Sequence, residues 1–433
     1  MKKIFFLIQS VFMLSFCANA QSNLSLTDAV NIALKNSLDI QISKNKIEQA
    51  KINNHLSIAG GYPQVTGSIV DNESITTVNQ KQNSGADISR NGAAANNLSA
   101  NITGSILLYN GGRVIATKKR LAELQLQSQQ QLNAQVQNVI ADVMVSYYDV
   151  IRQQDYIKTI DQSIAASNEQ LRIVQIRQQA GLANNADLFQ AQIDLNVLQQ
   201  SKLAQQLIAD QAKAELLRLL TLKADSTISI QDTILVDKAV TLETVLNAVN
   251  KNADILAAEH QIRISEQILK ETSAQRYPSI RATTGYNFTR NQTAAGQLLL
   301  NQNYGPTIGV SVGIPIYNGS IYRRQQRIAA IDIKNAGLQK DILIRDYNAT
   351  AVKQFQAYTN TINQLDTAVQ NYQLSGKLLN LVLLKFQYKQ ATIVEVKNAQ
   401  QSFVESGFRL VNLNYAAKAA EIELKRLANT LVP

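Results

Sequence analysis

Two stretches of the chain alternate apolar and polar residues with a period of two and then pass directly into long helical patterns. The first alternating stretch, residues 98–109, breaks at Asn110-Gly111-Gly112, and residues 113–180 contain neither Gly nor Pro. The second, within residues 304–316, is followed by a long helical pattern over 320–388. A period of two indicates a strand and a period near 3.6 a helix. The pattern therefore predicts two strand-to-helix junctions, at Tyr109, Asn110 and Gly111 and at Tyr317, Asn318 and Gly319.

The remaining elements are predicted from similar patterns and from their end signals. Helices are expected over 24–36 and 39–58, and a strand opened by Tyr62-Pro63 over 62–70. Residues 71–97 are rich in Asn, Gln, Ser and Gly, which predicts a long exposed loop. Helices are also expected over 186–222 and 394–430, and a third strand over 279–290. Pro306 weakens the fourth strand, because proline cannot donate a backbone hydrogen bond.

The second half of the chain repeats the first. Tyr62-Pro63 recurs as Tyr277-Pro278, 215 residues later, and Tyr109-Asn110-Gly111 recurs as Tyr317-Asn318-Gly319, 208 residues later. The 208-residue offset persists to the end of the chain, where Arg218 matches Arg426. We therefore expect a tandem duplication, with one repeat over 21–235 and another over 236–433. The predicted fold class is α+β and mostly α.

The strands divide their residues between an apolar and a polar face. In the second strand Leu98, Ala100 and Ile102 alternate with Ser99, Asn101 and Thr103. This pattern is typical of outer-membrane strands that face lipid on one side and water on the other. A water-soluble sheet with one buried face shows the same alternation, but too few strands are predicted to cover such a face. Four strands cannot close a barrel, so a membrane role requires several copies of the chain.

The long helices carry apolar residues at steps of three and four, as in a coiled coil. The first places Ile157, Ile160, Ile164, Leu171 and Val174 in this stripe, and the second has an equivalent stripe from Ile328 to Phe386. At 1.5 Å per residue each helix would be about 100 Å long. That length indicates an extended helical bundle and not the core of a compact globular domain.

The N-terminus has the features of a secretory signal. Lys2-Lys3 precede an apolar segment over 4–16, and Ala18-Asn19-Ala20 is a cleavage site, which predicts a signal peptide over 1–20. Cys17, the only cysteine, would be removed with it; the alternative is a lipid-attachment site, which Phe16 fits poorly. No later segment is apolar enough for a transmembrane helix.

Composition excludes several other classes of function. The formal net charge of +10 is spread along helices, so a solvated basic surface fits better than nucleic-acid binding. His55 and His260, the only histidines, do not correspond under the repeat and are expected to be surface residues, not metal ligands. No phosphate-binding loop or catalytic constellation is present. We expect no cofactor, no metal and no enzymatic activity.

The duplication, the Tyr-Pro strand openings, the Tyr-Asn-Gly junctions and the segment Gln179–Gln192 together resemble the TolC-like outer membrane efflux proteins, or outer membrane factors. The resemblance covers essentially the whole mature chain. It implies a homotrimer in the outer membrane, with a 12-stranded β-barrel continued across the periplasm by a 12-helix α-barrel. It also implies docking to a periplasmic adaptor (membrane fusion protein) and an inner-membrane pump. The expected function is a passive exit duct of a tripartite efflux pump or a type I secretion system.

The resemblance also implies particular sites. The helix-tip turns are expected to contact the adaptor: Gly181, Leu182, Ala183, Asn184 and Asn185 in the first repeat, and Lys389, Gln390, Ala391, Thr392 and Ile393 in the second. Lys389 stands where the first repeat has glycine, which leaves open whether both tips bind alike. Asp366, Asn371, Gln373 and Lys385 are expected either to line a periplasmic constriction or to form a solvated helix face. The rival to the duct is a soluble periplasmic coiled-coil structural or adaptor protein.

Overall fold

The computed structural model describes residues 23–81, 83, 85, 87–295 and 298–432. The predicted signal peptide and Cys17 lie outside this part of the chain. The described residues form two compact units. One contains residues up to 44, 130–256 and 342–432, and the other contains residues 45–129 and 257–341. In the described part of the chain, no helix combines the length and the apolar character needed to cross a bilayer.

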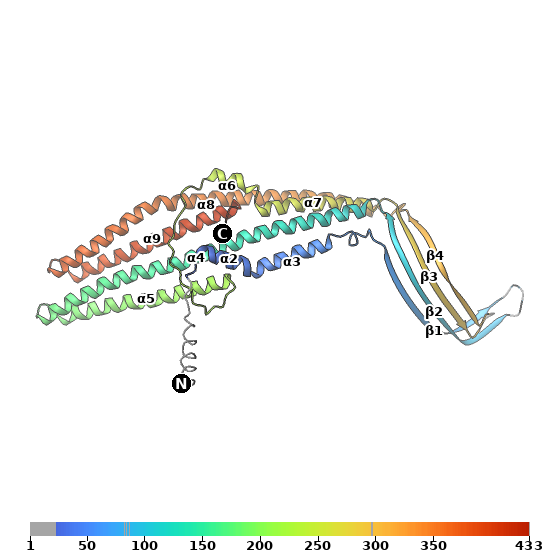
Figure 1. The fold of residues 1–433 in the computed structure, drawn as a ribbon, viewed down its shortest axis with the longest axis horizontal. Coiled ribbons are helices and arrows are strands. Elements are labelled where there is room, and N and C mark those ends of the chain that lie inside the picture. Colours follow the sequence, from blue (N-terminus) through green and yellow to red (C-terminus); the bar gives the residue numbers. More distant parts are fainter. Residues whose placement is uncertain (1–22, 82, 84, 86, 296–297, 433) are drawn as a thin grey trace, which may run out of the picture. The chain divides into compact units, whose positions relative to one another are not determined.

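The first unit is a wall of helices (Figure 1). Its main helices are α4 (Arg113–Gln179), α5 (Asn185–Leu219), α8 (Ile321–Gln387) and α9 (Ile393–Leu427), of which α4 and α8 begin in the other unit. The shorter helices of this unit are α2 (Leu26–Asn36) and α6 (Leu242–Val249). Helix α3 (Leu38–Asn53) begins here and ends in the other unit, which also contains nearly all of α7 (Ala253–Ala274). The long helices therefore match those predicted from the 3.6 period.

The two hairpins, α4–α5 and α8–α9, pack closely along their inner helices. Tyr156 of α4 contacts Phe408 of α9, with ring centroids 4.6 Å apart. A Cβ at Gly407 would lie 2.5 Å from the Thr159 side chain, so only glycine permits this approach between α9 and α4. Figure 1 shows α5 and α8 as the two outer helices of this wall.

The predicted apolar stripe of α4 is only partly correct toward the end of the helix. Ile160 and Val174 are buried as predicted, but Ile164 and Leu171 are only partly buried. Between Ile160 and Val174, the fully buried positions are Ser163, Ser167 and Gln170. The three polar residues recur at steps of four and three, so they lie on one face. Small and polar side chains therefore replace aliphatic ones on this face between Ile160 and Val174.

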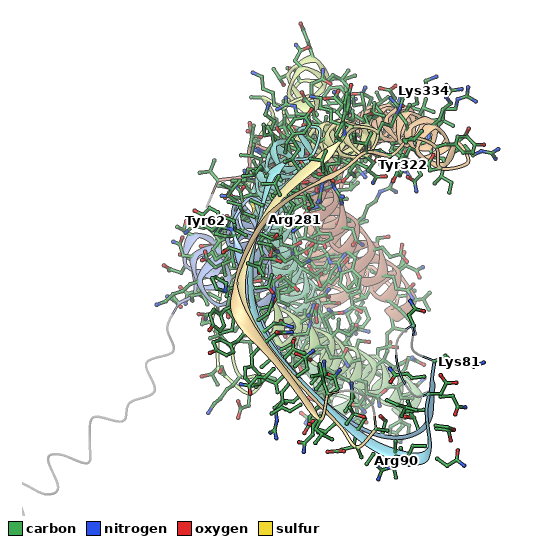
Figure 2. All side chains as sticks on the ribbon, turned by 90° about the vertical axis from the view of Figure 1, so that its right-hand side faces the viewer. Tyr62, Lys81, Arg90, Arg281, Tyr322 and Lys334 are labelled. Carbon is green, nitrogen blue, oxygen red and sulfur yellow. The ribbon has the colours of Figure 1, made fainter. Side chains whose placement is uncertain are left out.

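The second unit contains a four-stranded antiparallel sheet in the order β1-β2-β3-β4, with β1 Gln64–Gln80, β2 Ile88–Tyr109, β3 Ser279–Thr293 and β4 Leu300–Gly313. In Figure 2, Lys81 and Arg90 lie at the hairpin end of β1 and β2, whereas Tyr62 and Tyr322 lie near the helices.

The long loop predicted over 71–97 is wrong, because most of it is strand. Pairing of β1 with β2 continues through Thr76↔Ala93 to Gln80↔Ile88, with one irregularity between Thr76 and Val78. The backbone N–H and C=O groups of this polar segment form hydrogen bonds with the partner strand, and these bonds do not depend on the side chains. The fourth strand is also shifted, because β4 ends at Gly313, before Ile314 and Ile316. Pro306 is tolerated because β4 is an edge strand of this sheet.

Candidate functional site

The sheet has one apolar and one polar face. Direct partners in an antiparallel pair project from the same face, so the register assigns every side chain. Ile69, Ala100, Phe288 and Tyr304 form one row across all four strands, and Thr283 and Gly309 belong to the opposite face. The apolar face also carries Val65, Ile75, Leu98, Ile102, Ile106, Ile280, Ala282, Tyr286, Ile308, Val310 and Val312. The predicted division of the strands is confirmed.

This apolar face is exposed. Ile308 is 92% exposed, Ile69 is 77% exposed and Val310 is 67% exposed. From Val312 to Tyr304 the apolar rows extend along β4 for about 27 Å at 3.4 Å per residue, close to the apolar band of about 25 Å in outer-membrane strands. Beyond it, the next row is polar except for Leu98 and contains Asp71, Arg290 and Gln302. A bounded apolar band of this kind fits a lipid bilayer and would be unstable in water.

Glycine sets the first strand-to-helix junction. Gly111 has φ +68°, and a Cβ there would lie 2.7 Å from the carbonyl oxygen of Ala274 and from Cβ of Tyr277. The Asn110 side chain accepts a hydrogen bond from the backbone N–H of Val114 at 3.3 Å, which caps the start of α4. Tyr109 ends β2 and is 46% exposed.

The second junction repeats this backbone conformation with looser packing. Gly319 has φ +66°, but a Cβ there would meet nothing within 4 Å. The Asn318 carbonyl oxygen accepts from the N–H of Ile321 at 3.3 Å, as that of Asn110 does from Arg113. Tyr317 is largely exposed. The first junction requires glycine for space as well as for φ, and the second only for φ.

The two helix tips have the same backbone turn. Gly181 has φ +70°, and the N–H of Leu182 donates to the carbonyl of Arg177 at 2.7 Å. Lys389 has φ +63°, and the N–H of Gln390 donates to the carbonyl of Lys385 at 2.8 Å. Both are helix ends of the Schellman type. Lys389 therefore leaves the turn unchanged but places a side chain in a conformation that favours glycine.

Each tip then starts its second helix with a capping side chain. Asn184 accepts from the N–H of Asp187 at 2.8 Å, so α5 begins at Asn185. Thr392 accepts from the N–H of Glu395 at 3.2 Å, and the Glu395 carboxylate accepts from the N–H of Thr392 at 2.6 Å. Hydrogen bonds to Thr392 lower the pKa of Glu395. Ala183 lies between the two helices of the first tip; in the second tip Ala391 and Ile393 pack into the cluster described next.

An apolar cluster joins the tips. It contains Ile173 and Val174 of α4, Ala191 of α5, Phe386 of α8 and Val396 of α9. The Arg177 guanidinium lies 4.5 Å from the centroid of the Phe386 ring and also donates to the Phe386 carbonyl. The sequence did not identify Arg177 as part of this contact. Its counterpart in the second repeat, Lys385, is also basic, and this match could have drawn attention to the position.

Sequence reasoning also missed an ion pair near the tips. The Lys397 ammonium of α9 lies 2.9 Å from the Asp194 carboxylate of α5, and Asp194 is buried. Gln190 donates to the same carboxylate oxygen at 2.9 Å. The pair links the second helix of each hairpin. Neither residue is distinguished by sequence pattern, because helical charges are usually solvated.

The four residues predicted for the constriction do not share one face. Asp366 and Gln373 are seven residues apart on α8, about two turns, and so lie on one side. Asn371 and Lys385 are fourteen residues apart and share a second side, rotated from the first by about 100° or more. All four are exposed, and Asp366 lies 3.9 Å from the Lys238 ammonium. At 100° per residue, the first pair lies roughly opposite the buried Ser375 and Leu379, whereas the second pair lies closer to them.

The two histidines have ordinary polar partners. His260 on α7 lies 2.7 Å from the Glu123 carboxylate of α4 and is largely buried, so its predicted surface position is wrong. His55 follows the end of α3 and lies 2.7 Å from the Ser57 hydroxyl. Among the described residues there is no group of three or more His, Cys, Asp or Glu side chains that could hold a metal ion.

A sheet with an exposed apolar band, joined to helices of 67 residues, is the architecture of a membrane protein with an extended helical part. The chain belongs to the outer membrane efflux protein family, whose model matches residues 29–221 and 245–430. It is thus a TolC-like transport protein of the outer membrane. The two matched stretches correspond to the two halves of the sequence.

Known proteins resemble the chain over most of its length. It is 25% identical over 315 residues to the outer membrane protein TolC of Vibrio cholerae, covering 70% of each chain. It is 20% identical over 319 residues to the proteases secretion protein PrtF of Dickeya chrysanthemi, covering 71% of this chain and 67% of that one. The solved structure of VceC from Vibrio cholerae is similar in fold, with a TM-score of 0.75, 17% identity and coverage of 93% and 96%.

Proposed function

We propose that the protein is the passive exit duct of a tripartite efflux pump or a type I secretion system. The observation that carries the proposal is the two-faced sheet. Its exposed apolar band fits lipid, and the polar face behind it, with Thr103, Thr283 and Thr307, fits a water-filled lumen. The relatives include TolC and a protease secretion protein, and these names support efflux and protein secretion, respectively, as the two alternatives.

The duct is a homotrimer. In the described sheet, β1 and β4 each pair on one side only, and unpaired edges are strongly disfavoured in lipid. Three copies supply twelve strands for a closed β-barrel and twelve helical segments for an α-barrel. The outer helices of the wall support the same closure, because α5 exposes Phe189, Ile193 and Val197 and α8 exposes Leu374, Leu378 and Leu381. Each set recurs at steps of three or four, so it forms a stripe for the next copy.

The repeats over 21–235 and 236–433 each supply two strands and one helical hairpin to this assembly. The tips, Gly181 to Asn185 and Lys389 to Ile393, dock to a periplasmic adaptor, which in turn joins an inner-membrane pump. The shared turn geometry supports equivalent docking of both backbones, with the Lys389 side chain as the difference. Asp366 and Gln373 line the constriction, whereas Asn371 and Lys385 lie beside the exposed leucines and contact the neighbouring copy.

Cell fractionation tests this function against a soluble coiled-coil protein of the periplasm. The duct partitions with outer membranes and is released by detergent but not by high salt. In addition, deletion of the gene raises the intracellular level of an exported compound or protein. Recovery of the protein in the detergent-free soluble fraction would establish the soluble alternative.

A further inference from the structure

The helix-proximal end of the sheet is unusually basic. Residues 105–122 and 272–331 contain no Asp or Glu. The same stretches contain a basic collar, by which we mean Arg113, Lys118, Lys119, Arg120, Arg276, Arg281, Arg323, Arg324 and Arg327. Neither α4 nor α8 has an acidic residue in its first turn. Helix N-termini already carry a partial positive charge, so arginines there are electrostatically unfavourable unless an anion accompanies them.

Few of these cations have an acidic partner. Arg120 pairs with Glu271 at 2.7 Å, and Lys118 donates to Asn54. Within the described residues, no carboxylate oxygen lies within 4.0 Å of the Arg113 or Arg281 guanidinium. The Arg281 guanidinium donates a hydrogen bond to the Ser105 hydroxyl at 3.4 Å. Both guanidiniums therefore retain donors for an external anion.

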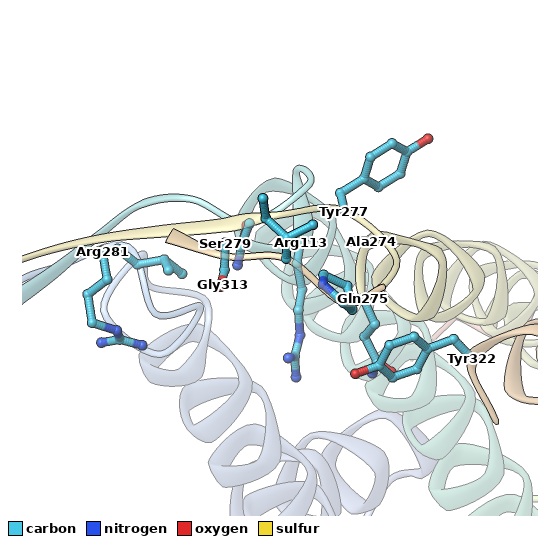
Figure 3. Close-up of a pocket in the computed structure, with 12 residues that line it drawn as sticks. Arg113, Ala274, Gln275, Tyr277, Ser279, Arg281, Gly313 and Tyr322 are labelled. Atoms are coloured by element: carbon cyan, nitrogen blue, oxygen red, sulfur yellow. The ribbon is translucent and has the colours of Figure 1, made fainter. Parts of the chain in front are cut away.

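Arg113 and Arg281 line one cavity of about 580 Å³, together with Tyr322, Gln275, Asn110 and Ile314 (Figure 3). In this view the two arginines extend to the same side of the sheet and Tyr277 to the other. Arg281 is the direct partner of Leu107 and Ser311, so it belongs to the polar face and not to the lipid face. The position favours an anion from the lumen over a lipid headgroup.

The lining also indicates the class of anion. A guanidinium binds carboxylate or phosphate oxygens through parallel hydrogen bonds. The Tyr322 ring and the Ile314 and Pro315 side chains add apolar surface beside them. A pair of guanidiniums with an aromatic and an aliphatic wall suits an organic anion with an apolar body.

We propose that Arg113 and Arg281 form an anion-binding ring in the lumen, where the barrel joins the helical tube, and that it admits organic carboxylates and phosphates in preference to cations. The inference rests on the proposed exit duct and specifies the charge class of its cargo. Three copies place six guanidiniums around one passage. Such focused charge raises the local concentration of the opposite ion.

Single-channel recording in a planar bilayer tests the proposal. The wild-type channel is expected to be anion-selective in a KCl gradient, and benzoate is expected to reduce its chloride current more than neutral benzyl alcohol does. In the double variant Arg113→Gln/Arg281→Gln, the chloride-to-potassium permeability ratio should fall, and benzoate block should weaken, each by about threefold or more. Trimer mass and barrel content are measured first, so that a folding defect is recognised.

Arg290→Gln is the matched control, because Arg290 is on the same strand but on the lipid-facing side. It should leave both quantities unchanged. Equal effects of Arg281→Gln and Arg290→Gln, or no effect of the double variant on a conducting channel, would overturn the proposal. An effect seen only in bilayers containing phosphatidylglycerol would assign the arginines to lipid and also overturn it. A wild-type protein that forms no conducting pore would instead contradict the exit duct itself.

Discussion

Lys389 holds a backbone conformation that a residue with a side chain adopts only at a cost. Its φ of +63° is almost that of Gly181, which occupies the same place in the first repeat. Replacement Lys389→Gly should therefore stabilise the tip by about 1 kcal/mol. Gly181→Ala should destabilise it by a similar amount, because a Cβ there is strained although nothing blocks it. Thermal unfolding of both variants in detergent measures these shifts; a lower melting temperature for Lys389→Gly would contradict the account.

Asp237 provides a test that depends on pH. The backbone N–H of Ala239, and then the Lys425 ammonium at 3.0 Å, lower the pKa of its carboxyl group. The folded pKa lies below the unfolded value, so this stabilisation is present at neutral pH. It is lost as pH falls through the folded pKa. Because the side chain is 44% exposed, solvent screening limits the contribution to roughly 1 kcal/mol or less.

Melting curves from neutral to acidic pH should show Asp237→Asn less stable than the wild type at pH 7. The difference should shrink as the pH falls below 4. Asp366→Asn serves as the control, since Asp366 is more exposed and lies 3.9 Å from its nearest cation. A difference for Asp237→Asn that grows in acid would rule out this role of the carboxylate.

Among elements, β4 places residues of the apolar face and of the polar face next to each other. Ile308 belongs to the apolar face and Thr307 to the polar face, and both are exposed. Ile308→Lys should cost about 2–4 kcal/mol near the middle of the membrane, whereas Thr307→Lys should cost less than 1 kcal/mol because its side chain reaches water. Urea unfolding in lipid vesicles compares the two variants. Equal costs would mean that the exposed apolar face does not contact lipid.

The elements also show which features the sequence could predict. Each long helix begins and ends within two residues of its predicted bounds, because Gly at both ends of α4 and the absence of Pro mark it. The first two strands are longer than predicted, because the pairing between β1 and β2 continues where side-chain alternation stops. Alternation of apolar and polar side chains indicates that one face of a strand is buried in lipid or protein. Backbone hydrogen bonds between strands form without such burial, so strands can extend beyond the alternating residues.

Of the sites, the sequence could predict the junctions and tip turns, because glycine and capping residues act locally. It could not predict which face of α8 contains Asp366, or that Asp194 pairs with Lys397, 203 residues away. Such contacts depend on the packing of two hairpins. The buried Ser163 and Ser167 of α4 were missed for the same reason: Ser163, for example, lines a cavity together with residues of both α5 and α9.

For the whole molecule, the exposed apolar stripes on α5 and α8 should hold the trimer together. Leu378→Asp places a charge in the α8 stripe and should weaken association by about 2 kcal/mol or more per interface. Asn380→Asp changes a nearby residue that is also exposed but is not three or four residues from any leucine of this stripe, and it should leave the trimer intact. Chemical cross-linking of the purified protein distinguishes them. An unchanged trimer in Leu378→Asp would exclude this surface from the interface.

The central claim is that three copies close one barrel and one helical tube. The most direct test is the mass of the protein extracted from outer membranes in mild detergent, with bound detergent subtracted. Three copies of the mature chain are expected, about 45 kDa each after removal of residues 1–20 from a 47.7 kDa precursor. A stable single copy, whether in detergent or in the soluble fraction, would contradict it.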